Sequence, residues 1–222
     1  MINDFLEEIK VDRLWEATVE TIYMTTISVA VTFVLGIILG LILYVTSKGG
    51  LWENAIIHFI FSTIVNVFRS IPFIILLVLL IPFTRAIVGT MLGANAALPA
   101  LIIGAAPFYA RMVEIALREI DKGVIEASQA MGASSFTIVR KVLIPEAMPA
   151  LISGITVTAI ALVSYTAMAG VIAAGGLGHL AYLEGFQRNN SMITLVATVA
   201  ILIIVFIIQW IGDYFTHKTD KR

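Results

Sequence analysis

The chain has 222 residues, of which 59% are hydrophobic and 13% are charged, and its mean hydropathy is +0.99. This composition excludes a soluble globular domain and predicts a protein that lies in a lipid bilayer. A net charge of −1 without a basic tract argues against nucleic-acid binding, and the absence of cysteine excludes disulfides and thiolate metal sites.

Five apolar runs are long enough to cross a membrane, for which a helix needs roughly 20 mostly apolar residues. They predict transmembrane spans at about residues 21–45, 56–81, 97–118, 148–172 and 192–212. The segment of residues 1–20 lacks the basic region and the small-residue cleavage site of a signal peptide, so we expect it to be retained. Because no internal repeat divides the runs, residues 1–222 are predicted to form a single all-α transmembrane domain.

Three charged residues fall inside the second and third predicted spans: Arg69, Arg111 and Glu114. Charge inside a bilayer is costly unless it is paired or hydrated. We interpret the three as a static ion-pair brace in which Arg69 pairs with Glu114; the alternative is that they line a vestibule and rearrange. Pro72 and Pro107 lie in the same two spans and predict kinks there, either for packing or for gating.

The longest polar interruption lies between the third and fourth spans. Apolar residues at helical spacing, with a candidate cap at Asp121 and a left-handed exit at Gly132, predict a short amphipathic helix; these apolar residues are Ile120, Val124, Ala127 and Met131. Ser134 or Ser135 is expected to cap a second short helix that carries Phe136. The two helices together cover about residues 121–143, and an ordinary surface loop is the alternative.

Small, polar and flexible side chains gather near the middle of the fourth span. We predict that Ser164, Tyr165 and Met168 form a substrate pathway or gate, because a thioether is adaptable enough to close a pore and to yield to a linear apolar side chain. The alternative for Met168 is that it fills a gap in the core. The glycine-rich stretch of residues 173–178 is expected to end this helix.

The distribution of Lys and Arg predicts the orientation of the chain. Five spans place the termini on opposite sides. One set of connections and tails holds Lys48, Arg118, Lys122, Arg140, Lys141, Lys218, Lys221 and Arg222, whereas the other holds only Lys10, Arg13, Arg85 and Arg188. We therefore expect the C-terminus and the polar interruption to lie in the cytoplasm and the N-terminus to lie outside.

Nothing in the sequence predicts an enzyme. The phosphate-binding pattern Gly-x-x-x-x-Gly-Lys-Ser/Thr is absent, so energy from ATP would have to come from a partner. The three histidines are scattered and do not form a His-Glu-x-x-His zinc site. We expect no cofactor and no metal in this chain, and the rival interpretation, a membrane-embedded enzyme or scaffold, is disfavoured.

The order Glu126-Ala127-Ser128, then Gly132, then Val142-Leu143-Ile144-Pro145 resembles the EAA motif of ABC importer permeases, which reads EAA, three residues, G, nine residues, I-x-L-P. The resemblance implies a type I ABC importer permease fold that is homodimeric and has two cytoplasmic coupling helices. It further implies that a separate ATPase receives these helices; the coupling residues would be Glu126, Ala127, Ser128, Met131, Gly132, Ala133 and Pro145.

Further segments are similar to the methionine permeases of that family, among them residues 66–77, 104–114 and 175–178. Ser70-Ile71-Pro72 stands where permeases for polar amino acids typically have Gly-Thr-Pro. The resemblance implies transport of L- and D-methionine by alternating access across the bacterial cytoplasmic (inner) membrane. The implied partners are two ATPase subunits that carry ATP and Mg²⁺, a second copy of this chain and an extracytoplasmic methionine-binding protein or lipoprotein. Another small amino acid or a peptide is the alternative substrate.

Overall fold

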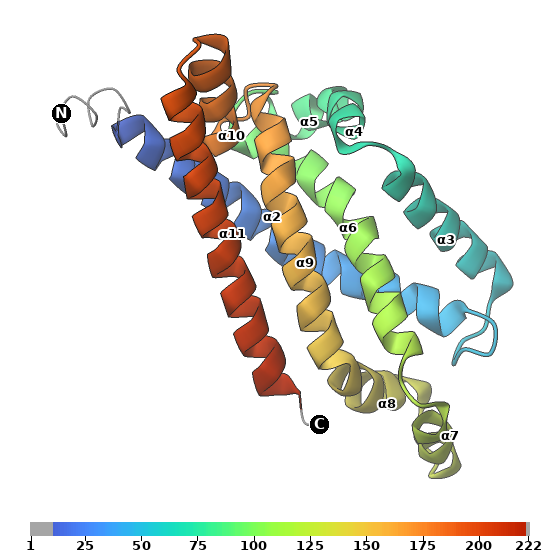
Figure 1. Ribbon diagram of the computed structural model, residues 1–222. Coiled ribbons are helices and arrows are strands. Elements are labelled where there is room, and N and C mark those ends of the chain that lie inside the picture. The colour runs from blue at the N-terminus through green and yellow to red at the C-terminus, as the bar shows by residue number, and fades with distance from the viewer. Residues whose placement is uncertain (1–10, 221–222) are drawn as a thin grey trace. The chain divides into compact units, whose positions relative to one another are not determined.

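The computed structural model describes residues 11–220, and every regular element in that part of the chain is a helix (Figure 1). The prediction of an all-α protein is therefore confirmed. The contacts divide the chain into two compact units. The first consists of the segments up to Val31, Ile71–Gly104 and Ala159–Gln209, and the second of Thr32–Ser70, Ala105–Thr158 and the segment from Trp210 onward.

Four helices within the described residues are long and apolar enough to cross a membrane. They are α2 (Val11–Thr46), α6 (Ala94–Arg118), the continuous helix Ser135–Gly170 that contains α9 (Ile144–Gly170), and α11 (Ser191–Thr219). A fifth span results if α3 (Ala55–Ser70) and α4 (Phe73–Leu79) count together. Each of the five predicted spans coincides with one of these elements, although α2 begins ten residues before the predicted start.

The second predicted span is not one straight helix, because the chain bends by 105° between α3 and α4. The break falls at Ile71 and Pro72, and the backbone of Pro72 is extended (φ −56°, ψ 134°). Proline has no N–H to donate, and it disfavours a helical conformation of the residue before it. The kink expected at Pro72 is thus confirmed, and it is a complete break. In contrast, α6 runs through Pro107 without interruption.

Several short helices fill connections in which the sequence predicted no element. They are α5 (Ile81–Val88), α10 (Gly176–Leu180) and the π-helical segment η2 (Ala181–Gln187). The described part of the connection between α6 and α9 holds α7 (Lys122–Ala130), α8 (Ser135–Ile138) and the π-helical segment η1 (Val139–Leu143).

Each unit has its own apolar core. In the first unit, Leu177 of α10 packs with buried residues of α2, α9 and α11 such as Ala17, Val163 and Ala197. In the second unit, Tyr109 of α6 lies in a core that extends to Ile138 and Leu143, and α2 approaches α6 closely at Gly36, where a Cβ would lie within 3.2 Å of the Tyr109 side chain. This second core joins the polar interruption to the spans on either side of it.

Candidate functional site

Local interactions fix both ends of α7. Asp121 caps its start, with Oδ1 accepting a hydrogen bond of 2.7 Å from the backbone N–H of Gly123. The chain leaves the helix at Gly132, which has a φ of +80°, a left-handed conformation that other residues seldom adopt. The N–H of Ala133 then donates to the carbonyl of Ser128 across 3.1 Å. The predicted cap and the predicted left-handed exit are both confirmed.

The helix that follows begins at the other predicted cap. Ser134, rather than Ser135, accepts a hydrogen bond of 3.3 Å from the N–H of Thr137. Its downstream boundary differs from the prediction, however, because α8 continues through η1 into α9. No gap separates the second short helix from the fourth span.

Pro145 explains why the continuous helix widens at η1. In a regular α-helix, the proline ring would clash with the carbonyl of Lys141, four residues earlier, and that carbonyl would lose its donor. The chain instead forms π-helical turns from Val139, and the N–H of Ile144 donates to the carbonyl of Val139. Pro145 therefore lies inside a helix and does not begin one. The consequence is that α8 extends directly into α9.

One face of α7 packs against the apolar core of the second unit, to which α7 itself belongs. Ser128 is buried, and its hydroxyl donates to the carbonyl of Val124 across 2.7 Å. Ile125 and Ala133 pack against the same core as Ile138. The inner face is therefore held by small and apolar residues, which attach α7 to the spans.

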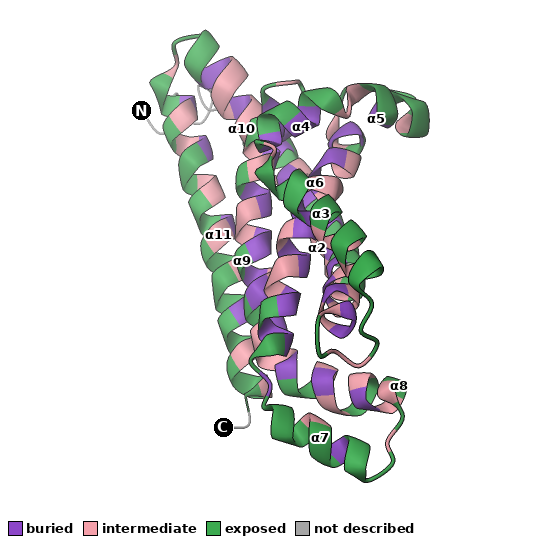
Figure 2. Ribbon diagram, turned by 90° about the vertical axis from the view of Figure 1, so that its right-hand side faces the viewer, coloured by how far each residue is buried: buried purple, intermediate pink, exposed green. Residues whose placement is uncertain are grey.

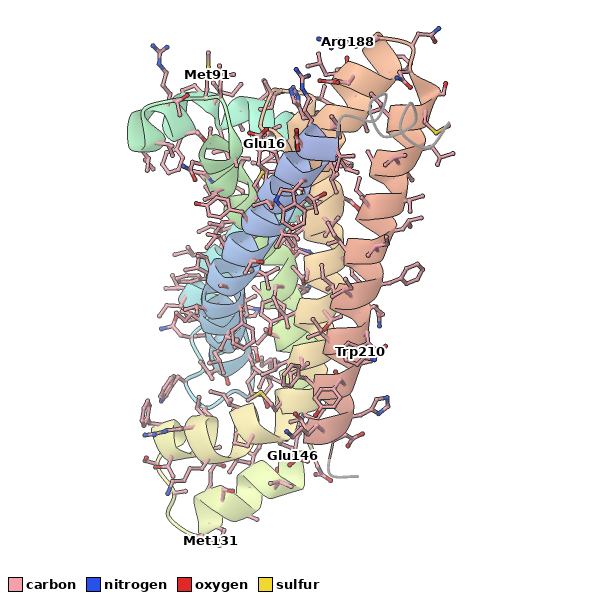
Figure 3. The ribbon with its side chains drawn as sticks, turned by 90° about the vertical axis from the view of Figure 1, so that its left-hand side faces the viewer. Glu16, Met91, Met131, Glu146, Arg188 and Trp210 are labelled. Atoms are coloured by element: carbon pink, nitrogen blue, oxygen red, sulfur yellow. The ribbon has the colours of Figure 1, made fainter. Side chains whose placement is uncertain are left out.

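The same segment also carries apolar residues that are uncovered, and α7 is largely exposed in Figure 2. Met131 is 81% exposed, Phe136 65% and Val124 46%, and Ala127 beside them is exposed as well. Figure 3 labels Met131 at the end of this segment. We call these four residues the docking face. Because α7 follows the end of a transmembrane helix, an apolar face at this place is suited to contact with a protein partner.

Glu126 and Gly132 frame the docking face, and both are exposed. Among the predicted coupling residues, Ser128 alone is buried, Ala133 is half-buried, and the others are exposed. The structure thus places six of the seven predicted residues in one segment, residues 126–133, and places Pro145 in α9.

The charges of α6 form a different brace from the one predicted. Glu114 is 1% exposed, with Oε2 2.5 Å from Nη1 of Arg111 and Oε1 2.7 Å from Nη2 of Arg118. The Nε of Arg118 also donates to Oε1 across 3.1 Å. Arg69 is exposed, and it forms no ion pair with Glu114 in the part of the chain that the structure describes. The predicted Arg69–Glu114 pair is wrong.

Arg118 is the functional candidate that sequence reasoning missed. Arg111 and Arg118 lie three residues before and four residues after Glu114, the two spacings at which side chains of one helix meet. This spacing can be read from the sequence, but Arg118 is the last residue of the predicted span and is considered there only as one of the cations that set the orientation.

The predicted pathway residues lie on α9 in the first unit. Ser164 and Met168 are one helical turn apart and exposed, and Met168 has 43% of its surface free. Met168 therefore does not fill a gap in the core of the single chain. Tyr165 is half-buried and stacks on Phe73 of α4. In the described residues, no group of three or more His, Asp or Glu side chains is placed to hold a metal ion.

Comparison with known proteins gives a consistent result. Residues 32–221 match the family described as "Binding-protein-dependent transport system inner membrane component". The chain is 63% identical over 222 residues, the full length of both proteins, to the methionine import system permease protein MetP of Bacillus subtilis strain 168. It is 58% identical over 151 residues, 68% of this chain and 70% of the other, to the D-methionine transport system permease protein MetI of Escherichia coli K12.

A solved structure matches over almost the whole chain. It is a chain of the MetNI methionine ABC transporter in an inward-facing conformation, with a TM-score of 0.94 and 48% identity, and the match covers 96% of this chain and 98% of that one. The all-helical fold and these likenesses agree. This chain therefore belongs to the family of binding-protein-dependent transport system inner membrane components.

Proposed function

We propose that this chain is the permease subunit of an ATP-driven importer and forms the pathway through which methionine crosses the cytoplasmic membrane. The observation that carries the proposal is the docking face, which is exposed on α7 and α8 and joined through η1 to a transmembrane helix. The substrate class rests on the 63% identity, over the full length, to a methionine import permease.

The partner suited to the docking face is an ATPase subunit that binds ATP and Mg²⁺. Met131 and Phe136 would enter an apolar groove of that subunit, while Glu126 lies at the exposed edge. Because α8 and α9 are continuous, movement of the groove would be transmitted to the span that carries Ser164 and Met168. Two ATPase subunits that approach and separate would thus open the pathway alternately to either side.

A second copy of the chain is suited to cover the exposed stripe of α9. Ser164 is a polar residue on a membrane-spanning helix, and exposure of such residues to lipid is unfavourable. Two copies related by a two-fold axis would face each other with Ser164 and Met168 and would enclose a pathway between them. Each 222-residue chain would then act as one transmembrane domain of the pair.

The orientation follows from the same assignment. The docking face must lie in the cytoplasm, where ATP is available, and the excess of Lys and Arg in the connections of that side supports this placement. The N-terminus would then lie outside, the side from which an extracytoplasmic methionine-binding protein or lipoprotein delivers substrate.

Reconstitution tests the proposal. The permease, its ATPase and its binding protein are assembled in proteoliposomes, and uptake of labelled L-methionine is measured with and without ATP. We expect ATP-dependent accumulation that unlabelled D-methionine reduces. Accumulation of a different amino acid or a peptide, but not of methionine, would overturn the substrate assignment, and uptake that needs no ATPase subunit would overturn the importer assignment.

A further inference from the structure

An aromatic pair links α4 to the predicted pathway. Phe73 is the first residue of α4, directly after the break at Pro72, and it is 7% exposed. Its ring stacks on that of Tyr165 with 4.3 Å between the centroids and 3° between the planes. Aromatic pairs usually have centroids about 4.5–7 Å apart, so this stack is close.

Gly104 of α6 makes room for this stack. A Cβ at position 104 would lie 3.1 Å from Cδ2 of Phe73 and 3.3 Å from Cδ2 of Leu76, which are tight contacts in a packed interior. Leu76 is itself 1% exposed and cannot easily move away. The phenyl ring of Phe73 is therefore held between the backbone of α6 and the ring of Tyr165.

Stacking is the contact that orients Tyr165. Within the described residues, the hydroxyl of Tyr165 makes no hydrogen bond that would fix its ring. Its neighbours in sequence and at the next turn, Ser164 and Met168, are exposed. A Tyr165 ring without Phe73 would be free to change its χ1 rotamer toward this exposed side of α9.

We infer that Phe73 is a positioning residue of the translocation pathway: it holds the ring of Tyr165 against α4 and so keeps open the space beside Ser164 and Met168 through which a linear apolar side chain passes. This inference rests on the proposed function. The substrate itself would meet Tyr165 and Met168, whereas Phe73 acts through Tyr165. Gly104 is part of the same packing arrangement, because a side chain at position 104 would displace Phe73.

The test uses the reconstituted importer described above, with the variants Phe73→Leu, Gly104→Ala and the two combined. Phe73→Leu removes the ring but keeps an apolar side chain. We expect it to lower the maximal uptake rate per assembled complex by about two- to tenfold, which corresponds to the loss of one aromatic pair. The apparent KM for the methionine-loaded binding protein should not change, because Phe73 is buried and offers almost no surface to a partner.

The double variant separates positioning from simple packing. Gly104→Ala alone should lower the rate in the same direction by pushing on Phe73. Combined with Phe73→Leu, the two losses should not simply add, because the smaller side chain at position 73 relieves the closer of the two contacts that the new methyl group makes. Phe83→Leu is the matched control, because Phe83 lies on α5 in the same unit and is 47% exposed. The importer that carries this variant should take up methionine at the rate of the unmodified importer.

A second measurement does not depend on the identity of the substrate. Because the chain has no cysteine, a Ser164→Cys background carries a single thiol beside Tyr165. Its rate of labelling by a water-soluble maleimide should fall when Phe73→Leu is added and should stay unchanged with Phe83→Leu. Equal labelling and equal uptake for the two leucine variants would overturn the positioning role, as would losses from Gly104→Ala and Phe73→Leu that simply add. Failure of the unmodified importer to accumulate methionine would instead reject the proposed function.

Discussion

The carboxylate of Glu114 is held inside the second unit by two guanidinium groups of its own helix. Arg118 binds one carboxylate oxygen through two donors and Arg111 binds the other. Arg111 and Arg118 keep 34% and 55% of their side-chain surface exposed, whereas the side chain of Glu114 is 1% exposed and is paired with both of them. A carboxylate is costly to bury unless its charge is compensated, and here the compensation comes from within α6.

Neutralising Glu114 should therefore destabilise the chain. In Glu114→Gln the charge-assisted hydrogen bonds are lost or weakened, and we expect a loss of about 1–3 kcal/mol in the free energy of unfolding. The measurement is thermal unfolding of the purified chain in detergent. Arg69→Gln is the matched control, because Arg69 is exposed and not paired with Glu114 in the described residues. Equal destabilisation by the two variants would contradict this account of the brace.

Gly132 shows how a single backbone conformation limits substitution. Its φ is +80°, but a Cβ built there meets nothing within 4 Å, so the obstacle to a side chain is conformational and not steric. Valine at this position would strain the turn by about 1–3 kcal/mol and shift the docking face. We expect Gly132→Val to reduce co-purification of the ATPase and ATP-dependent uptake, while membrane insertion is unaffected.

Gly49 provides the matched control for this prediction. It has a φ of +77° and equally open surroundings, but it lies between α2 and α3 and is not part of the docking face. Gly49→Val should carry the same backbone strain and still bind the ATPase. If both variants lose the ATPase to the same degree, general destabilisation and not the docking face explains the loss.

At the scale of elements, α7 and α8 combine a packed inner face with a free apolar outer face. Met131 contributes the largest exposed fraction of the docking face. Met131→Asp should weaken ATPase binding by about 1–2 kcal/mol or more, as expected for a charge placed in an apolar contact, without changing the stability of the isolated permease. Affinity is measured by titrating the ATPase onto the permease in detergent. Gln129→Asp, also exposed on α7, should have little effect; similar losses for both would argue for a charge effect alone.

Local sequence signals predicted the ends of α7 and the start of α8 better than they predicted how α8 joins α9. Asp121, Ser134 and Gly132 act on backbone groups within three or four residues, so their roles can be read from the chain itself. The π-helical turns before Pro145 depend on how the chain avoids a clash, and periodicity does not reveal them. Likewise, Pro72 predicted a kink but not its 105° extent, because a missing N–H interrupts the helix without setting the direction in which the chain continues.

At the scale of the whole molecule, hydropathy located the four long apolar helices and the bent pair of α3 and α4, because each run of apolar residues must exclude water along its full length. The short helices α10 and η2 escaped prediction because tertiary contacts hold them. The N–H of Gly176 donates to the carboxylate of Glu20 on α2 across 2.6 Å, and Glu184 of η2 forms an ion pair with Arg13 of α2. Contacts between residues so distant in sequence leave no local pattern.

Orientation in the membrane is the property of the whole chain on which the proposed function depends, and single cysteines can test it because the chain has none of its own. Met131→Cys lies in the connection before α9 and Asn189→Cys in the connection after it, and α9 crosses the membrane once between them. A membrane-impermeant maleimide applied to intact cells should therefore label Asn189→Cys but label Met131→Cys only after the membrane is opened. Labelling of Met131→Cys in intact cells would place the docking face outside, where no ATP-driven partner could bind it.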